Sequence, residues 1–271
     1  MALDDLDEEK VDLAFLVAAL KGADLSSIIT GVAQPQITRQ SLTRLQIPLP
    51  PLSEQKRITR ILDAADRLRA KRREALAHLD TLLQSTFLDL FGDPKDRKEQ
   101  SKAEFSFCSL GDQITLQRGK DITKKSAQCG PVPVISSGGI SFYHNTAIAT
   151  GPGVLLGRKG SVGKVHFSSD DYWPHDTTLY IKDFKGNEPI FVYHFFKLFP
   201  ISRYEASAAN PSLNQNNLHP VKVNWPPLPL QQRFAAIVEQ VEAQKARMRT
   251  QLTELDTLFA ALQQRAFNGE L

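Results

Sequence analysis

The fold is decided by an eight-residue stretch that occurs twice, as PPLSEQKR at residues 50–57 and as PPLPLQQR at residues 226–233. Aligned without gaps, residues 35–93 and 211–269 share 16 identities in 59 positions. The spacing between the two copies is far too long for a solenoid. The sequence therefore predicts two copies of one unit, a domain followed by a long helix, with the first domain mostly absent.

Both copies of the helix have clear limits. The first is expected to start after Pro50-Pro51, with Ser53 as its N-cap, and to end at Gly92-Asp93-Pro94, which cannot continue a helix. The second is expected from about Pro229 to Phe267. About 39 residues at 1.5 Å each give a length of roughly 58 Å. A short apolar helix is also expected before each copy, over 9–20 and 188–199.

Apolar residues recur along both helices at steps of three and four. They are Ile61, Ala65, Leu68, Ala75, Leu79 and Leu82 in the first helix, and Phe234, Ile237, Val241, Met248, Leu252, Leu255, Phe259 and Leu262 in the second. This spacing, sustained over several heptads, favours a coiled coil, and two similar helices in one chain can pair antiparallel. The alternative is two independent amphipathic helices that lie on domain surfaces.

Between the helices the pattern changes to short β-type runs separated by glycine and proline. Strands are expected at 113–117, 132–135, 153–156, 164–167 and 177–181. The predicted fold class is α+β, a β-rich globular domain flanked by two long helices that pair as an antiparallel coiled coil. The predicted domains are 1–46, 47–93, 94–226 and 227–271.

Composition narrows the class of protein. The chain has 271 residues, of which 41% are hydrophobic and 23% charged, which excludes a largely disordered chain. No apolar run approaches the roughly 18–20 residues of a membrane helix. Residues 1–9 hold five acids and no base, so an export signal is not expected and the protein is predicted to be cytoplasmic. Two cysteines cannot form a disulfide framework.

The charge is unevenly distributed. Residues 94–226 carry 16 Lys and Arg against 11 Asp and Glu, whereas the rest of the chain is slightly acidic. Residues 56–73 contain eight bases in eighteen positions. A locally basic surface suits a polyanion such as nucleic acid. The alternative interpretation, favoured on charge alone, is a solvated helix face.

Segments that resemble catalytic motifs do not match the patterns that those motifs require. The segment 154–164 resembles a strand leading into a phosphate loop, but five residues separate Gly157 from Gly163, where a P-loop has four. NPSL at 210–213 lacks the second proline and the aromatic residue of adenine methyltransferases. His175-Asp176 is interpreted as a polar pair in a loop rather than a base with its orienting acid. No catalytic or metal site is expected.

Taken together, the motifs resemble a known family. They are PPLxxQ at each helix start, LDTL at 79–82 and 255–258, FGD at 91–93 and FNG at 267–269, LGD at 110–112, RGK at 118–120, and GRKGSVG at 157–163. In this order and duplication they resemble the specificity subunit of type I restriction–modification systems. The resemblance covers the chain from about residue 9 to its end.

The resemblance implies a function without catalysis. The family's usual chain has two target recognition domains, separated by two helices that set the distance between two DNA half-sites. The implied partners are double-stranded DNA and two methyltransferase subunits, which methylate adenine with S-adenosylmethionine, with restriction subunits joining in some assemblies. No cofactor is expected on this chain itself.

This chain departs from the family in having one complete recognition domain. Two copies are expected to pair through their helices and to recognise a palindromic bipartite site. The partner interface is assigned to Ile61, Leu68, Leu79, Leu82, Ile237, Met248, Leu252 and Leu255. The apolar helix at residues 11–20 favours self-association. A monomer that keeps its own helix pair and contacts one half-site is the rival arrangement.

DNA-binding residues are expected in the loops of residues 94–226. The phosphate candidates are Arg118, Lys120, Lys124, Lys125, Arg158, Lys159 and Lys164, and Ser161 is also expected to bind DNA. The base-contacting candidates are Tyr143, His144, Asn145, His175, Tyr204, Asn210, Asn214 and Gln215. For residues 210–217 the alternative is helix capping and turn formation.

Two other functional classes stay open for the protein. One is a self-contained enzyme, and the other is a coiled-coil adaptor that does not recognise DNA.

Overall fold

The computed structural model describes residues 6–30, 34–95, 104–206 and 212–270, and the chain forms two compact units. The first unit comprises residues 1–80 and 243–271, and the second comprises residues 81–242. Two long helices contribute to both units, and a β-rich domain lies between them in the chain. The predicted α+β class with paired long helices is confirmed. Within the described ranges, no helix is long and apolar enough to cross a membrane.

The long helices are α3 (Leu52–Phe91) and α7 (Leu228–Phe267). Ser53, the expected N-cap, is instead the second residue of α3, because the helix starts directly after Pro51. Gly92 ends α3 with a φ of 80°, a left-handed conformation that suits glycine, and its N–H donates to the carbonyl of Leu88.

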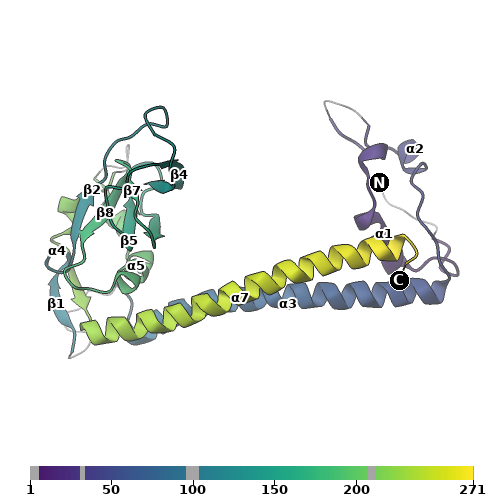
Figure 1. The fold of residues 1–271 in the computed structure, drawn as a ribbon. Coiled ribbons are helices and arrows are strands. Elements are labelled where there is room, and N and C mark those ends of the chain that lie inside the picture. The colour runs from purple at the N-terminus through teal and green to yellow at the C-terminus, as the bar shows by residue number, and fades with distance from the viewer. Residues whose placement is uncertain (1–5, 31–33, 96–103, 207–211, 271) are drawn as a thin grey trace. The chain divides into compact units, whose positions relative to one another are not determined.

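The two helices lie side by side and antiparallel (Figure 1). In the first unit, Arg69 pairs with Asp256 and Asp80 pairs with Lys245. In the second unit, the rings of Phe87 and Phe234 meet edge to face with centroids 5.4 Å apart. In these three contacts, a higher residue number on α3 goes with a lower residue number on α7. The two helices are therefore antiparallel.

The side chains between the helices form what we call the helix interface. It contains Ile58, Leu62, Ala65, Arg69, Arg72, Leu76, Leu79 and Leu83 on α3, and Phe234, Val238, Val241, Lys245, Met248, Leu252, Leu255, Phe259, Leu262 and Ala266 on α7, all buried or half-buried. Steps of four and three alternate along both helices, as in a heptad repeat. The set of apolar residues that the sequence places between the helices is therefore partly wrong, because Leu68 and Leu82 are 55% and 47% exposed. Ile61 and Ile237 lie one residue off the interface and are half-buried.

In the first unit, a small helical layer covers one end of the helix pair. It consists of α1 (Leu13–Gly22), the 3-10 helix η1 (Ser26–Ile28) and α2 (Arg39–Leu42). Asp12 caps α1 by accepting from the N–H of Phe15 at 2.9 Å. Phe15 is buried against Ile58 and Ala266, so the layer is anchored on both long helices.

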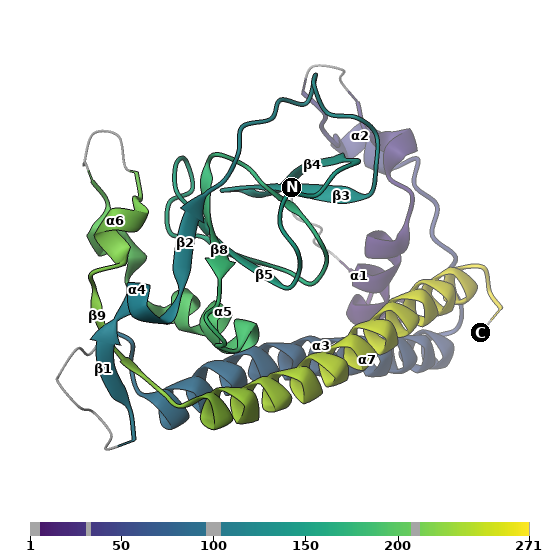
Figure 2. The same ribbon diagram turned by 60° about the vertical axis from the view of Figure 1, so that its left-hand side comes forward.

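The second unit contains three small sheets (Figure 2). Their strands are β1 (Ser106–Ser109), β2 (Thr115–Arg118), β3 (Val132–Ser136), β4 (Gly139–His144), β5 (Gly153–Gly157), β6 (Val165–Ser168), β7 (Trp173–Pro174), β8 (Thr178–Asp183) and β9 (Lys222–Trp225). The orders are β1-β9, β2-β8-β5-β6 and β4-β3-β7; all pairs are antiparallel except β3 with β7. The five expected strands are present, but the expected start at Gln113 is wrong, because Leu110–Gln113 forms helix α4.

Helices cover the four-stranded sheet of the second unit. They are α5 (Pro189–Leu198), the 3-10 helix η2 (Ile201–Tyr204) and α6 (Gln215–Leu218). Phe191 of α5 is buried between Phe87 of α3 and Trp225 of β9. This aromatic contact joins the end of the long helix to the core of the sheet domain.

The internal repeat is present in the structure. At the offset of 176 residues that relates the two copies, α2 corresponds to α6, α3 to α7 and, upstream of the aligned segment, α1 to α5, and the bounds of each pair coincide at both ends. Residues 12–46 therefore have the same helices in the same order as residues 188–222. This agrees with the interpretation of residues 1–46 as the end of a recognition domain, although the predicted domain boundaries stay a prediction.

Candidate nucleic-acid interface

Loops from four places in the sequence meet on one face of the second unit. The N–H of Lys120, after β2, donates to the carbonyl of Pro174 at 2.9 Å. Arg158, after β5, donates its N–H to the carbonyl of Thr177 at 2.8 Å. Ser137, in the β3–β4 turn, donates its N–H to the hydroxyl of Thr177 at 3.2 Å. The turn between β7 and β8 thus gathers the other three loops around it.

Glycines allow the loops to approach so closely. A β-carbon on Gly119 would collide with the backbone carbonyls of Pro174 and His175. A β-carbon on Gly157 would collide with the carbonyl of Ser161. The RGK and GRKGSVG motifs therefore combine cations with the glycines that their loops need. The loop after Gly157 leads into strand β6 rather than a helix, which agrees with the rejection of a P-loop.

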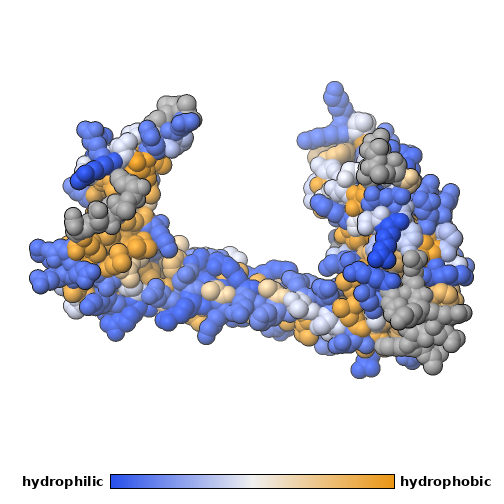
Figure 3. Space-filling model, turned by 180° about the vertical axis from the view of Figure 1, so that it is seen from behind, coloured by the Kyte–Doolittle hydropathy of each residue, from blue (hydrophilic) through white to orange (hydrophobic). Residues whose placement is uncertain are grey.

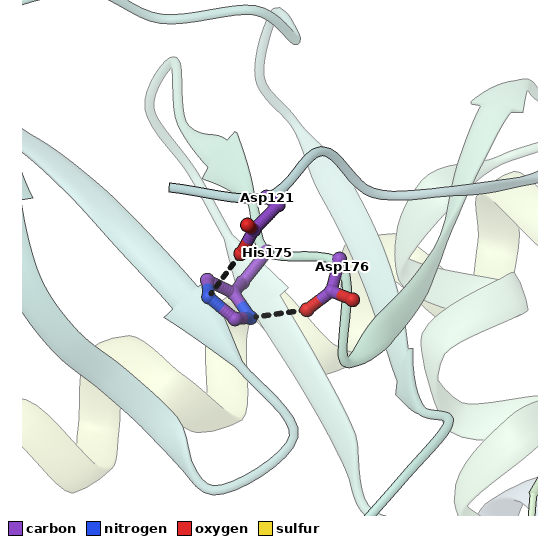
Figure 4. Close-up of side chains that lie close together, drawn as sticks. All are labelled: Asp121, His175 and Asp176. Atoms are coloured by element: carbon purple, nitrogen blue, oxygen red, sulfur yellow. Dashed lines mark ion pairs between the residues drawn. The ribbon is translucent and has the colours of Figure 1, made fainter. Parts of the chain in front are cut away.

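Asp121, His175 and Asp176 form a polar cluster on this face (Figure 4), and Arg118 pairs with its Asp176. Asp176 accepts from Nη2 of Arg118 at 2.7 Å, and its other carboxylate oxygen lies 3.1 Å from Nδ1 of His175. On the far side of the ring, Asp121 lies 3.8 Å from Nε2. Arg118 is held through one nitrogen and is half exposed, so its remaining N–H groups can bind a ligand. His175-Asp176 is thus a polar loop pair that positions an arginine.

The same cluster is the chain's candidate cation site in the described ranges. Asp121, His175 and Asp176 each offer a ligand atom, and these atoms lie within 4.8 Å of one another. However, Arg118 already forms an ion pair with Asp176, and a guanidinium beside the carboxylate opposes a metal ion there. The residues present fit an arginine better than a metal.

Arg158 has a buried group without a partner. Its Nη1 is buried and makes no hydrogen bond within the described part of the chain. Burial lowers the pKa of the Arg158 guanidinium, the nearby positive charge of Arg118 adds to this, and Asp176 opposes it. Buried donors in folded proteins are almost always satisfied, so this N–H group is suited to an acceptor that a ligand supplies.

Most of the expected phosphate contacts lie on the gathered loops. Lys120, Lys159 and Lys164 are exposed there, and Ser161 is half-buried. Lys120 also lies 5.8 Å from the ring of Trp173. Lys124 and Lys125 are exposed on a separate turn, for which the structure gives no contact with the other candidates in the described ranges.

The residues that are expected to contact bases differ in their exposure to solvent. Tyr143 and Asn145 are exposed at the end of β4, and Asn145 donates to the side chain of Gln128 at 2.7 Å. His144 is buried against Trp173 and accepts from the N–H of Gln128, so the expectation that it faces DNA is not supported.

The remaining candidates follow α5. Tyr204 stacks on Phe199 with ring centroids 5.5 Å apart, so its ring packs within the protein. Asn214 caps α6 by accepting from the N–H of Asn216 at 3.0 Å, which is the capping alternative. Gln215 begins that helix and is half-buried. Asn210 lies outside the described residues.

Sequence reasoning missed residues that organise this face. Thr177 contacts two of the loops, Asp176 orients Arg118, and Ile140 is 57% exposed at the β3–β4 turn. The alternation in GISFYH at 139–144 signals a strand and could have revealed β4. The role of Thr177 depends on a parallel pairing, β3 with β7, that no local pattern predicts.

The family model for the type I restriction modification DNA specificity domain matches residues 2–78 and 102–257. The chain belongs to the type I restriction–modification specificity family. A putative type I restriction enzyme specificity subunit of Haemophilus influenzae is 24% identical in an alignment of 255 residues that covers 87% of this chain. This chain spans 66% of the length of that relative.

Solved specificity subunits share the fold. The S subunit of a type I restriction–modification system from M. genitalium matches 97% of this chain and 74% of its own, with a TM-score of 0.65 and 18% identity. The HsdS subunit from Thermoanaerobacter tengcongensis matches 98% of this chain and 72% of its own, with a TM-score of 0.52 and 19% identity. At these identities the likeness is one of fold.

Proposed function

We propose that this chain is the sequence-specific DNA-binding subunit of a type I restriction–modification enzyme, with the second unit as its recognition domain. The observation that carries the proposal is the gathering of four loops on one face, with Arg118, Lys120, Arg158, Lys159 and Lys164 on them. Exposed cations next to glycine-rich backbone contact phosphates and position a protein on DNA. Arg118, oriented by Asp176, also has the fork geometry that bonds guanine.

The chemistry belongs to partners. We propose that methyltransferase subunits, which bind S-adenosylmethionine, are directed by this chain to adenine in a bipartite site, and that restriction subunits join the same assembly. The chain contributes binding and orientation, because its polar cluster of Asp176 and His175 is engaged in holding Arg118.

Two copies of the chain are proposed to associate through the long helices. Ile61, Leu68, Leu82, Ile237 and Leu258 each stand one residue before a position of the helix interface, and we call them the apolar flank. Asp80 and Asp256 each stand one residue after such a position, so the ion pairs lie on the opposite side. Leu68, Leu82 and Leu258 are 55%, 47% and 50% exposed, which suits contact with further helices.

The first unit has a second apolar surface. Leu13 and Val17 of α1 are exposed, and a hollow of about 740 Å³ lies beside them, lined also by Leu62 and Phe259. Hydrophobic atoms are visible on the surface of the first unit, in the left-hand part of Figure 3. This surface fits the expectation that the apolar helix at residues 11–20 favours self-association.

The proposal is tested by co-expression with a type I methyltransferase subunit, followed by long-read mapping of methylated adenine. A split motif that appears only when both chains are present supports guidance by this chain. A palindromic motif supports two copies in one assembly, and an asymmetric motif means that another specificity chain supplies the second half-site. A stable complex without any motif contradicts recognition and leaves a helical adaptor.

A further inference from the structure

The turn between β3 and β4 presents a large aliphatic side chain to solvent. Ile140, the second residue of β4, is 57% exposed, although Ile135, its partner on β3, is buried. A single exposed isoleucine is common on protein surfaces and does not by itself indicate a binding site. The structure around Ile140, however, favours a role in binding.

The turn that carries Ile140 is rigidly held. The hydroxyl of Ser136 donates to the carbonyl of Gly139 at 3.1 Å and accepts from the hydroxyl of Ser141 at 2.7 Å. The carbonyl of Ser137 lies 2.9 Å from Nε2 of His166. A hairpin whose backbone is held in this way loses little conformational entropy on binding, so the position of Ile140 is preorganised.

Cations lie next to this turn. The β5–β6 loop passes so close that a β-carbon on Gly160 would lie 3.5 Å from the hydroxyl of Ser137. Arg158 and the exposed Lys159 belong to this loop and directly precede Gly160. An apolar tip bordered by cations is complementary to the DNA major groove, which has phosphates at its rims and thymine 5-methyl groups on its floor.

We infer that the β3–β4 hairpin enters the major groove and that Ile140 contacts the methyl group of a thymine in the recognised sequence. The groove is about 12 Å wide and admits a two-stranded ribbon. Arg158 and Lys159 then reach the adjoining backbone. Ile140 is thus a specificity-determining residue. This inference rests on the proposed function, since it assigns one base contact within that recognition.

The test replaces single thymines by deoxyuridine, which lacks only the methyl group. The full chain first selects its preferred sequence from a random duplex library, and each thymine of that sequence is then substituted in turn. Loss of one buried methyl contact should weaken binding of the wild type about fourfold at one position. Ile140→Ala should bind the thymine and deoxyuridine duplexes equally at that position.

Ile148→Ala provides the matched control, because Ile148 is an exposed isoleucine, at 40%, in the same unit but outside the hairpin. It should keep the wild-type sensitivity to deoxyuridine. Equal melting temperatures for all three proteins would show that the variants are folded. If no substitution weakens the wild type, or if Ile140→Ala stays sensitive, the inference is wrong while the proposed function stands. A wild type that selects no sequence overturns both.

Discussion

Lys245 and Asp80 form an ion pair between the long helices, with Nζ and Oδ1 2.7 Å apart. The internal repeat provides a second pair, because the alignment of the two copies places Arg69 opposite Lys245 and Asp80 opposite Asp256. Arg69 and Asp256 lie 2.6 Å apart. The helix interface therefore contains one charged contact twice. Such contacts fix the register of paired helices, because a shift by one heptad would separate both pairs.

Removal of Asp80 should destabilise the helix pair. The side chain of Lys245 is 6% exposed, so Asp80→Ala leaves a buried ammonium without this partner. Asp80 itself is largely exposed, and we expect a loss of about 1–2 kcal/mol in the free energy of unfolding, measured by urea denaturation. Asp63→Ala, an exposed acid on the same helix, is the control. Equal stability of both variants would contradict a structural role for the pair.

The glutamine of the PPLxxQ motif should be required for stability in both copies of the repeat. Gln55 accepts from the N–H of Asp12 and donates to the carbonyls of Lys10 and Pro50. Gln231 accepts from the N–H of Glu188 and donates to the carbonyl of Pro226. Each amide joins the start of a long helix to the start of the short helix before it.

Gln55→Ala or Gln231→Ala should lower the free energy of unfolding by about 2–3 kcal/mol, because buried backbone groups lose their partners. Chemical denaturation of each variant measures the loss. Gln232→Ala changes an exposed glutamine next to Gln231 and should have no effect. A Gln231 variant as stable as the Gln232 variant would show that the motif is shared by the two copies for another reason.

Loss of the loop cations should weaken binding to every DNA sequence. Replacing Arg158 and Lys159 with alanine removes two phosphate contacts, so the slope of log K against log salt should become shallower by about 2. Fluorescence anisotropy with unrelated duplexes measures this slope. Lys182→Ala, an exposed lysine at the far end of β8, should leave the slope unchanged. Unaltered binding by the double variant would remove this loop from the interface.

The apolar flank should be needed for association but not for folding. Leu68→Ser with Leu258→Ser changes exposed positions, so the melting temperature should stay within a few degrees while the light-scattering mass falls to that of one chain. Leu252→Ser changes a half-buried position of the helix interface and should lower the melting temperature. A wild type that is itself monomeric would refute association through this flank.

The second unit should lose stability in mild acid. Nε2 of His219 accepts from the N–H of Leu116 at 3.0 Å, and burial lowers the pKa of this ring, with a further contribution from Lys185. Below about pH 6.5 the unfolded chain binds a proton that the folded chain resists, so stability falls as the pH decreases. Urea denaturation at pH 7.5 and 5.5 should show a smaller difference for His219→Gln. His78→Gln, an exposed histidine on α3, should behave as the wild type.

Sequence alone located the long helices well, because Pro51 and Gly92 are strong local signals. The face between the helices was harder to predict. A search for apolar periodicity selects Leu68 and Leu82 and passes over Arg69 and Lys245, because charged residues are not expected in a helix interface. Their aliphatic stems and ion pairs allow burial, and this depends on a partner on the other helix.

The recognition face could be predicted only in part. The motifs with Arg118 and Arg158 were identified, since cations beside glycines signal a loop that binds an anion. Asp176 and Thr177 were not assigned their roles, because these depend on contacts between strands far apart in the sequence. The burial of His144 cannot be predicted from the sequence for the same reason, since nothing in its neighbourhood along the chain indicates packing against Trp173.

The pairing of β1 with β9 brings Ser106 opposite Trp225, so the chain enters and leaves the recognition domain at nearly the same place. A domain attached in this way is a topological insertion between α3 and α7. Recombination at the two joints can exchange it for a domain of another length or sequence without shifting the heptad phase of either helix. Under the proposed function, a chain can therefore acquire a new DNA specificity by cassette exchange while both long helices are inherited unchanged.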